Sequence, residues 1–154
     1  MPNEGDVVGY ISGSFDLLHH GHLKRLEEAK KLCDFLYVGI WDDDMTNYYK
    51  GEAYPIVSIQ ERVLMTLACK HVDDVVIGAP FILTKDLIQS LNIQKVFHIT
   101  DTDEDTVLDQ YGSIDQYQIA KALGIYEAIT IQNPFYEVTT EMIAHRVVKN
   151  KEAF

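Results

Sequence analysis

The sequence predicts an α/β protein with a doubly wound parallel sheet of about five strands, covered by helices on both faces. Apolar, β-branched runs alternate with segments of helical periodicity along the chain. The apolar runs are continuous rather than alternating, which is typical of strands that are buried on both faces. No internal repeat, low-complexity tract or linker interrupts the 154 residues. We therefore expect one domain over residues 1–154.

The first part of the chain is expected to form two strands around one helix. Residues 6–11 (DVVGYI) and 35–41 (FLYVGIW) are typical of buried strands. Residues 22–33 have helical periodicity, with one apolar side made by Leu23, Leu26, Ala29 and Cys33. Residues 42–57 carry three successive aspartates and then a glycine and a proline, so we expect a loop there.

The middle of the chain continues the alternation. Ser58 and Glu61 have the spacing of a capping box, which predicts the start of a helix over 59–70. A strand over 73–80 and a short helix over 84–92, with Thr84 as its N-cap, are expected next.

The last part of the chain provides two further strands and two helices. Strands are expected over 94–100 and 126–131. Ser113 and Gln116 form a second capping-box pattern before the helical segment 117–123, which Gly124 ends. A final helix is expected to begin near Thr139.

Composition limits the classes of function. The net charge of −11 disfavours nucleic acid as a partner, because such binding needs clustered lysine and arginine. No apolar run is long enough to span a bilayer, and the first residues lack the pattern of a secretory signal. The two cysteines have no metal-binding or disulfide spacing. We expect a cytoplasmic protein.

Three of the six histidines lie within four residues, in the segment DLLHHGHLK over 16–24. This segment joins the first strand to the first helix, where doubly wound folds bind phosphate groups. His19 and His22 are three residues apart at the helix start and flank Gly21, which permits close approach of an anion. Zinc is the competing ligand, but no third ligand has a suitable spacing. His20 points elsewhere by helical geometry.

The same segment carries a resemblance. GSFDLLHHGH, over 13–22, resembles the Gly-x-Phe-Asp-x-x-His-x-Gly-His signature of the nucleotidylyltransferases, and of the cytidylyltransferases among them. Residues 48–84 are similar to the C-terminal repeat of ethanolamine-phosphate cytidylyltransferases. The choline-phosphate enzymes are similar but more distant. The resemblance covers nearly the whole chain and is specific over its first 85 residues or so.

The resemblance implies that the phosphate of phosphoethanolamine attacks the α-phosphorus of CTP, giving CDP-ethanolamine and pyrophosphate for phosphatidylethanolamine synthesis. Mg²⁺ is expected with the triphosphate, and no metal site on the chain itself. His19 and His22 are implied as catalytic donors to the triphosphate, and Lys50 as a contact to the α-phosphate. Asp16 is implied to bond to the backbone and hold the histidine loop.

The binding residues that the resemblance implies fall into two groups. Nucleotide binding is assigned to Ser14, Phe15, Gly21, Thr139 and Thr140. Binding of the amino-alcohol phosphate is assigned to Asp43, Phe81, His98 and Tyr117. Phe81 replaces a tryptophan that is typical of the choline enzymes, and a smaller aromatic site suits a primary ammonium group.

One segment departs from the family pattern. Active cytidylyltransferases carry Arg-Thr-Glu-Gly-Ile-Ser-Thr-Ser before the last helix, whereas this chain has NPFYEVTTEM over 133–142. Two further hypotheses therefore remain open. One is a non-catalytic repeat that supports an N-terminal catalytic repeat. The other is an enzyme with another substrate, for which phosphocholine is the first choice and adenylyl transfer ranks lower. We expect a repeat from a longer two-repeat chain, whose partner is the N-terminal repeat or a second copy.

Overall fold

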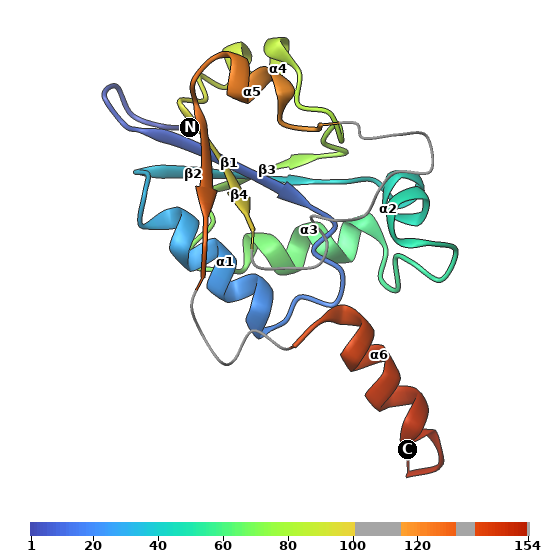
Figure 1. The fold of residues 1–154 in the computed structure, drawn as a ribbon. Coiled ribbons are helices and arrows are strands. Elements are labelled where there is room, and N and C mark those ends of the chain that lie inside the picture. Colours follow the sequence, from blue (N-terminus) through green and yellow to red (C-terminus); the bar gives the residue numbers. More distant parts are fainter. Residues whose placement is uncertain (101–114, 132–137, 154) are drawn as a thin grey trace.

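The computed structural model describes residues 1–100, 115–131 and 138–153 (Figure 1). Within these residues, five parallel strands form a sheet in the order β3-β2-β1-β4-β5. The strands are β1 (Val8–Gly13), β2 (Phe35–Ile40), β3 (Asp74–Ile77), β4 (Lys95–Ile99) and β5 (Tyr126–Ile129). The doubly wound parallel sheet predicted from the sequence is confirmed.

Helices cover both faces of this sheet (Figure 1). One face is covered by α1 (His20–Lys30) and α3 (Ile59–Leu67), and the other by α4 (Lys85–Ser90) and α5 (Gln118–Ala122). The helix α6 (Thr140–Lys149) leads away from the sheet and ends in a short 3₁₀ turn, Lys151–Ala153 (Figure 1).

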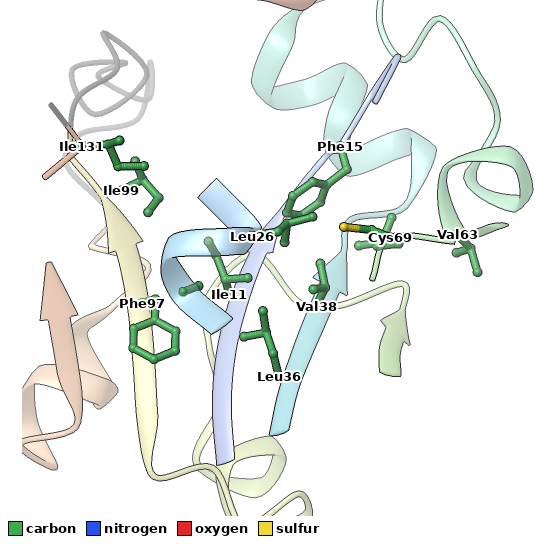
Figure 2. Close-up of a cluster of buried hydrophobic side chains, with 12 residues drawn as sticks. Ile11, Phe15, Leu26, Leu36, Val38, Val63, Cys69, Phe97, Ile99 and Ile131 are labelled. Atoms are coloured by element: carbon green, nitrogen blue, oxygen red, sulfur yellow. The ribbon is translucent and has the colours of Figure 1, made fainter. Parts of the chain in front are cut away.

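Figure 2 shows the larger apolar cluster, which lies between the sheet and α1. Leu26 packs there against side chains of β1 and β2, and is fully buried. The predicted apolar side of α1 is wrong at Leu23, which is 41% exposed. His22 takes the buried position in that turn, so the buried stripe of α1 runs through His22, Leu26 and Ala29.

The expected loop over 42–57 is wrong for its first half, because α2 spans Asp43–Lys50. The Asp42 carboxylate accepts the Met45 N–H at 2.6 Å and so caps the helix. Gly51, with a φ of 104°, ends it. Within α2, the buried residue is the polar Thr46, so burial in this helix does not follow apolar residues.

Three predicted helix starts are confirmed. Glu61 accepts the Ser58 N–H at 2.9 Å, the Thr84 hydroxyl accepts from Leu87 at 3.2 Å, and the Thr139 hydroxyl accepts from Met142 at 3.2 Å. The predicted capping box at Ser113 lies outside the described residues.

Candidate active site

A pocket lies at the carboxyl ends of β1 and β4, between which the strand order reverses. This is the place where doubly wound sheets bind ligands. The pocket is lined by Ile11, Ser12, Gly13, Ser14, Phe15, His22, Arg25, Trp41, Tyr49, Lys50, Phe97, His98, Ile99, Gln116 and Tyr117. It therefore gathers side chains from both halves of the sequence.

The two histidines of the signature cap the start of α1 reciprocally. The Nδ1 atom of His19 accepts the Gly21 N–H at 3.1 Å, and the Nδ1 atom of His22 accepts the His19 N–H at 3.3 Å. Their rings lie close together, with centroids 3.9 Å apart and planes tilted by 34°. Because each Nδ1 atom is an acceptor, the proton of each neutral ring is on Nε2. Each ring can therefore present an Nε2–H donor.

His22 is held in its neutral form. Its side chain is 6% exposed, and burial lowers its pKa well below 6.5. Proximity to the side chains of His19, Arg25 and Lys50 lowers this pKa further. A neutral donor beside two cationic side chains suits an anionic ligand, since it adds a hydrogen bond without a further desolvated charge.

The depressed pKa of His22 predicts a pH dependence of stability. The unfolded chain protonates this ring near pH 6.5, whereas the folded chain does so only at lower pH. Between those two pH values the unfolded state binds more protons. The free energy of unfolding therefore decreases as the pH is lowered below 6.5, by at most about 1.4 kcal/mol per pH unit, and this loss is absent above pH 6.5.

This pH dependence is measured by urea unfolding of the wild type and of His22→Asn at pH 7.5 and 5.5. Asparagine retains an acceptor for the His19 N–H but does not titrate. We expect the wild type to lose more stability than the variant on acidification. Parallel losses in the two proteins would contradict the assignment of this proton to His22.

Asp16 anchors the loop between β1 and α1, called the signature loop, through hydrogen bonds to backbone. Its fully buried carboxylate accepts the N–H groups of Ile56 and Val57 at 2.7 and 3.0 Å. The predicted bonding of Asp16 to backbone is confirmed, and its partners belong to the segment before α3. The loop is also strained, because Phe15 and Leu17 have φ values of 49° and 47°. Strain of this kind persists only where surrounding contacts enforce it.

Ser14 and Asp43 are joined through a buried arginine. The fully buried Arg62 donates to the Ser14 carbonyl and to the Asp43 carboxylate, each at 2.6 Å. Asp43, expected to bind the amino group of a substrate, is thus an ion-pair partner of Arg62 and does not line the pocket. Ser14 does line it, and Arg62 fixes its backbone.

Lys50 is the last residue of α2, and its side chain is only 10% exposed. Its Nζ atom lies 3.9 Å from the Glu141 carboxylate of α6. Lys50 lines the pocket, and its positive charge is close enough to His22 to lower the pKa of that ring. The structure therefore brings together the three predicted catalytic residues, His19, His22 and Lys50. Phe15 joins them, packing on the His22 ring at 5.4 Å.

The residues expected to bind the second substrate lie among aromatic rings. Phe81 packs on Trp41 and Tyr49 of the pocket wall, at centroid distances of 5.1 and 5.2 Å. The His98 ring stacks on Tyr117 at 4.4 Å, and both residues line the pocket. Phe81 itself does not line the pocket, but it supports the two aromatic rings that do, Trp41 and Tyr49.

The C-terminal segment closes on the signature loop. The buried Thr140 hydroxyl donates to the Asp16 carbonyl at 2.9 Å. A Cβ atom on Gly21 would lie 2.9 Å from the His19 ring and 3.0 Å from the Val138 carbonyl oxygen, so only glycine fits there. Thr139 caps α6, and neither threonine lines the pocket. Their contact with a nucleotide stays a prediction.

The family model described as cytidylyltransferase-like matches residues 10–146. The chain belongs to the cytidylyltransferase-like family. It is 41% identical to the ethanolamine-phosphate cytidylyltransferase of Dictyostelium discoideum over 97% of its length, and 30% identical to choline-phosphate cytidylyltransferase A of Rattus norvegicus over 99%. The chain spans 40% of the length of each of these two curated relatives.

A solved structure supports the same fold for this cytidylyltransferase-like chain. A lipopolysaccharide core biosynthesis protein from Thermoplasma volcanium matches with a TM-score of 0.62 and 22% identity, over 84% of this chain and 98% of that one. At this identity the likeness concerns the fold alone, and it agrees with the Rossmann-like nucleotidylyltransferase sheet described above.

The site of this cytidylyltransferase-like chain also contains residues that sequence reasoning missed. The pocket lining includes Arg25, Trp41, Tyr49 and Gln116. Arg62 supports the pocket by its hydrogen bond to the Ser14 carbonyl. Arg25 follows His22 by three residues on α1, so helical spacing places the two on one face and offered a signal. The other residues reach the site through contacts between distant segments, for which the sequence has no local pattern.

Two general properties of the described residues complete the site. No three histidine, cysteine, aspartate or glutamate side chains in the described ranges gather closely enough to hold a metal ion. No helix in those ranges is both long and apolar enough to cross a membrane. The segment that replaces Arg-Thr-Glu-Gly lies mostly outside the described residues.

Proposed function

We propose that this chain transfers the cytidylyl group of CTP to phosphoethanolamine. A phosphate oxygen of phosphoethanolamine attacks the α-phosphorus, the bond from that phosphorus to the bridging oxygen breaks, and pyrophosphate leaves with the electron pair. The reciprocal capping of His19 and His22 carries the proposal, because it orients the Nε2–H donors of two rings at a helix start. The higher identity to an ethanolamine enzyme than to a choline enzyme supports the substrate.

Each basic or polar residue then has a role. His19 and His22 donate to the triphosphate and stabilise the charge that develops on pyrophosphate. Lys50, fixed at the end of α2, holds the α-phosphate between the two substrates. The described residues that line the pocket include no carboxylate, so they do not suit a protein-held Mg²⁺. Mg²⁺ enters with CTP as part of the substrate. The proposed location is the cytoplasm.

The proposal is tested by pyrophosphate release from the chain with Mg²⁺, CTP and phosphoethanolamine, against a phosphocholine control. We expect release with phosphoethanolamine and at least about tenfold less with phosphocholine. Thermal stabilisation by CTP should exceed that by ATP or GTP at equal concentration. Stronger stabilisation by ATP would favour adenylyl transfer and contradict the proposal.

A second candidate is a repeat that binds CTP without turnover and supports a catalytic repeat in a longer chain or in a second copy. The replacement of Arg-Thr-Glu-Gly favours it, as does the 40% share of the relatives' length that the chain spans. CTP binding without pyrophosphate release, together with restored release on adding the partner repeat, would select this candidate.

The ion pair between Lys50 and Glu141 predicts a gain of affinity. Glu141→Gln removes the carboxylate that competes with phosphate for Lys50. Because Glu141 is half exposed, we expect CTP to bind only about two- to fivefold more tightly. Glu152→Gln, which makes the same change of net charge in the exposed turn after α6, is the control. Equal effects of the two variants in calorimetric titration would contradict a specific contact.

A further inference from the structure

The charged side chains that line the pocket are all cationic among the described residues. The cations Arg25 and Lys50 line it together with the neutral donor His22, and this set suits phosphates. A phosphorylated amino alcohol also carries an ammonium group, yet the described lining residues include no carboxylate to pair with it. The nearest expected carboxylate, Asp43, is paired with Arg62. The ammonium group therefore needs a neutral acceptor or an aromatic face.

Gln116 supplies such an acceptor. It lines the pocket, and its Oε1 atom is buried without a hydrogen-bond partner among the described residues. Buried carbonyl oxygens are ordinarily hydrogen-bonded, so this atom favours a ligand that donates to it. The buried Nε1–H of Trp41 also lines this pocket without an acceptor among the described residues, but it is a donor and so cannot accept from an ammonium group.

The backbone places Gln116 beside the aromatic wall. Its carbonyl accepts the Leu83 N–H at 3.2 Å, two residues after Phe81. Phe81 packs on Trp41 and Tyr49, which line the pocket with Gln116. Aromatic faces attract any ammonium group, including a quaternary one, whereas an amide oxygen attracts only an ammonium with N–H donors. The two elements together distinguish these classes of ligand.

We propose that the Gln116 carboxamide accepts a hydrogen bond from the primary ammonium group of the amino-alcohol substrate and thereby selects it over a trimethylammonium group. The inference rests on the proposed function and names its specificity-determining residue. A trimethylammonium group has no hydrogen to donate, so it leaves the Oε1 atom buried and unsatisfied. The aromatic wall then provides affinity common to both substrates, and Gln116 provides the difference between them.

The test uses the isosteric variant Gln116→Leu, with CDP-ethanolamine and CDP-choline as probes in calorimetric titrations. We expect Gln116→Leu to weaken CDP-ethanolamine binding about tenfold or more, and to change CTP and CDP-choline binding less than about threefold. Gln116→Glu retains an acceptor and should bind CDP-ethanolamine at least as tightly as the wild type. Gln118→Leu, on the exposed side of α5, is the matched control and should change none of the three affinities.

The outcomes separate this inference from the proposed function. An unchanged ratio of CDP-ethanolamine to CDP-choline affinity in Gln116→Leu, with CTP still bound, would overturn the role of Gln116 and leave cytidylyl transfer intact. Equal losses for all three ligands would assign Gln116 a structural role and also overturn the inference. A wild-type chain that binds neither CTP nor CDP-ethanolamine would overturn the inference together with the proposed function.

Discussion

Replacing His22 with asparagine is expected to lower the rate of pyrophosphate release at least about 100-fold. Asparagine retains an acceptor for the His19 N–H, so the start of α1 stays capped, but it has no donor at the Nε2 position. The variant loses the ring that packs on Phe15 and His19, which should cost no more than about 2 kcal/mol of stability. The loss of rate is therefore far larger than any loss of folded protein.

The complementary variant His22→Gln separates the two roles of the ring. Glutamine places an amide nitrogen near the Nε2 position but loses the acceptor that caps α1. We expect it to retain more of the rate than asparagine and to be less stable. CTP affinity, followed by thermal shift, should fall about tenfold in His22→Asn, so the role of His22 is measured even where turnover is slow. An unchanged rate and an unchanged affinity in His22→Asn would contradict the assignment.

Arg62→Met is expected to lower the free energy of unfolding by about 3 kcal/mol. The arginine is fully buried and joins the Ser14 carbonyl to Asp43, so its removal leaves a buried carbonyl without a donor. Asp43→Asn is the matched control. It retains an acceptor for Arg62, and the side chain of Asp43 is 47% exposed, so we expect at most about 1 kcal/mol.

Urea unfolding of the two variants at pH 7.5 measures this difference. We also expect Arg62→Met to weaken CTP binding, because Ser14 lines the pocket and its backbone position depends on Arg62. Equal stability of Arg62→Met and Asp43→Asn would show that the buried guanidinium contributes nothing beyond its ion pair, contrary to the geometry.

The elements and the histidine loop were predictable because their signals are local. Continuous apolar runs identify strands, and single residues such as Thr84 and Thr139 mark helix starts through bonds that span three positions. The reciprocal hydrogen bonds of His19 and His22 are also a local signal, since both residues lie within one helical turn. Local spacing was therefore sufficient to place the proposed catalytic donors.

The remaining features depend on contacts between distant segments. Helix α2 was missed because its buried residue is the polar Thr46 and its aromatic contact, from Tyr49, is made with Trp41 and Phe81 of other segments. Asp43 was expected in a substrate pocket, and its partner Arg62 lies 19 residues away on another helix. Gln116 was expected to cap a helix, yet it lines the pocket. Such positions are decided by packing, which spacing along the chain does not encode.

The bond from Thr140 to the Asp16 carbonyl spans 124 positions of the chain and has a consequence for the order in which the protein is built. The strands and the histidine loop emerge from the ribosome before α6, but the loop acquires its last hydrogen bond only when α6 arrives. Closing so long a loop is slow and entropically unfavourable, so this contact is expected late in folding. A nascent chain that stops short of residue 138 thus has its sheet but lacks a finished histidine loop. The histidine loop is therefore completed only after α6 has been made.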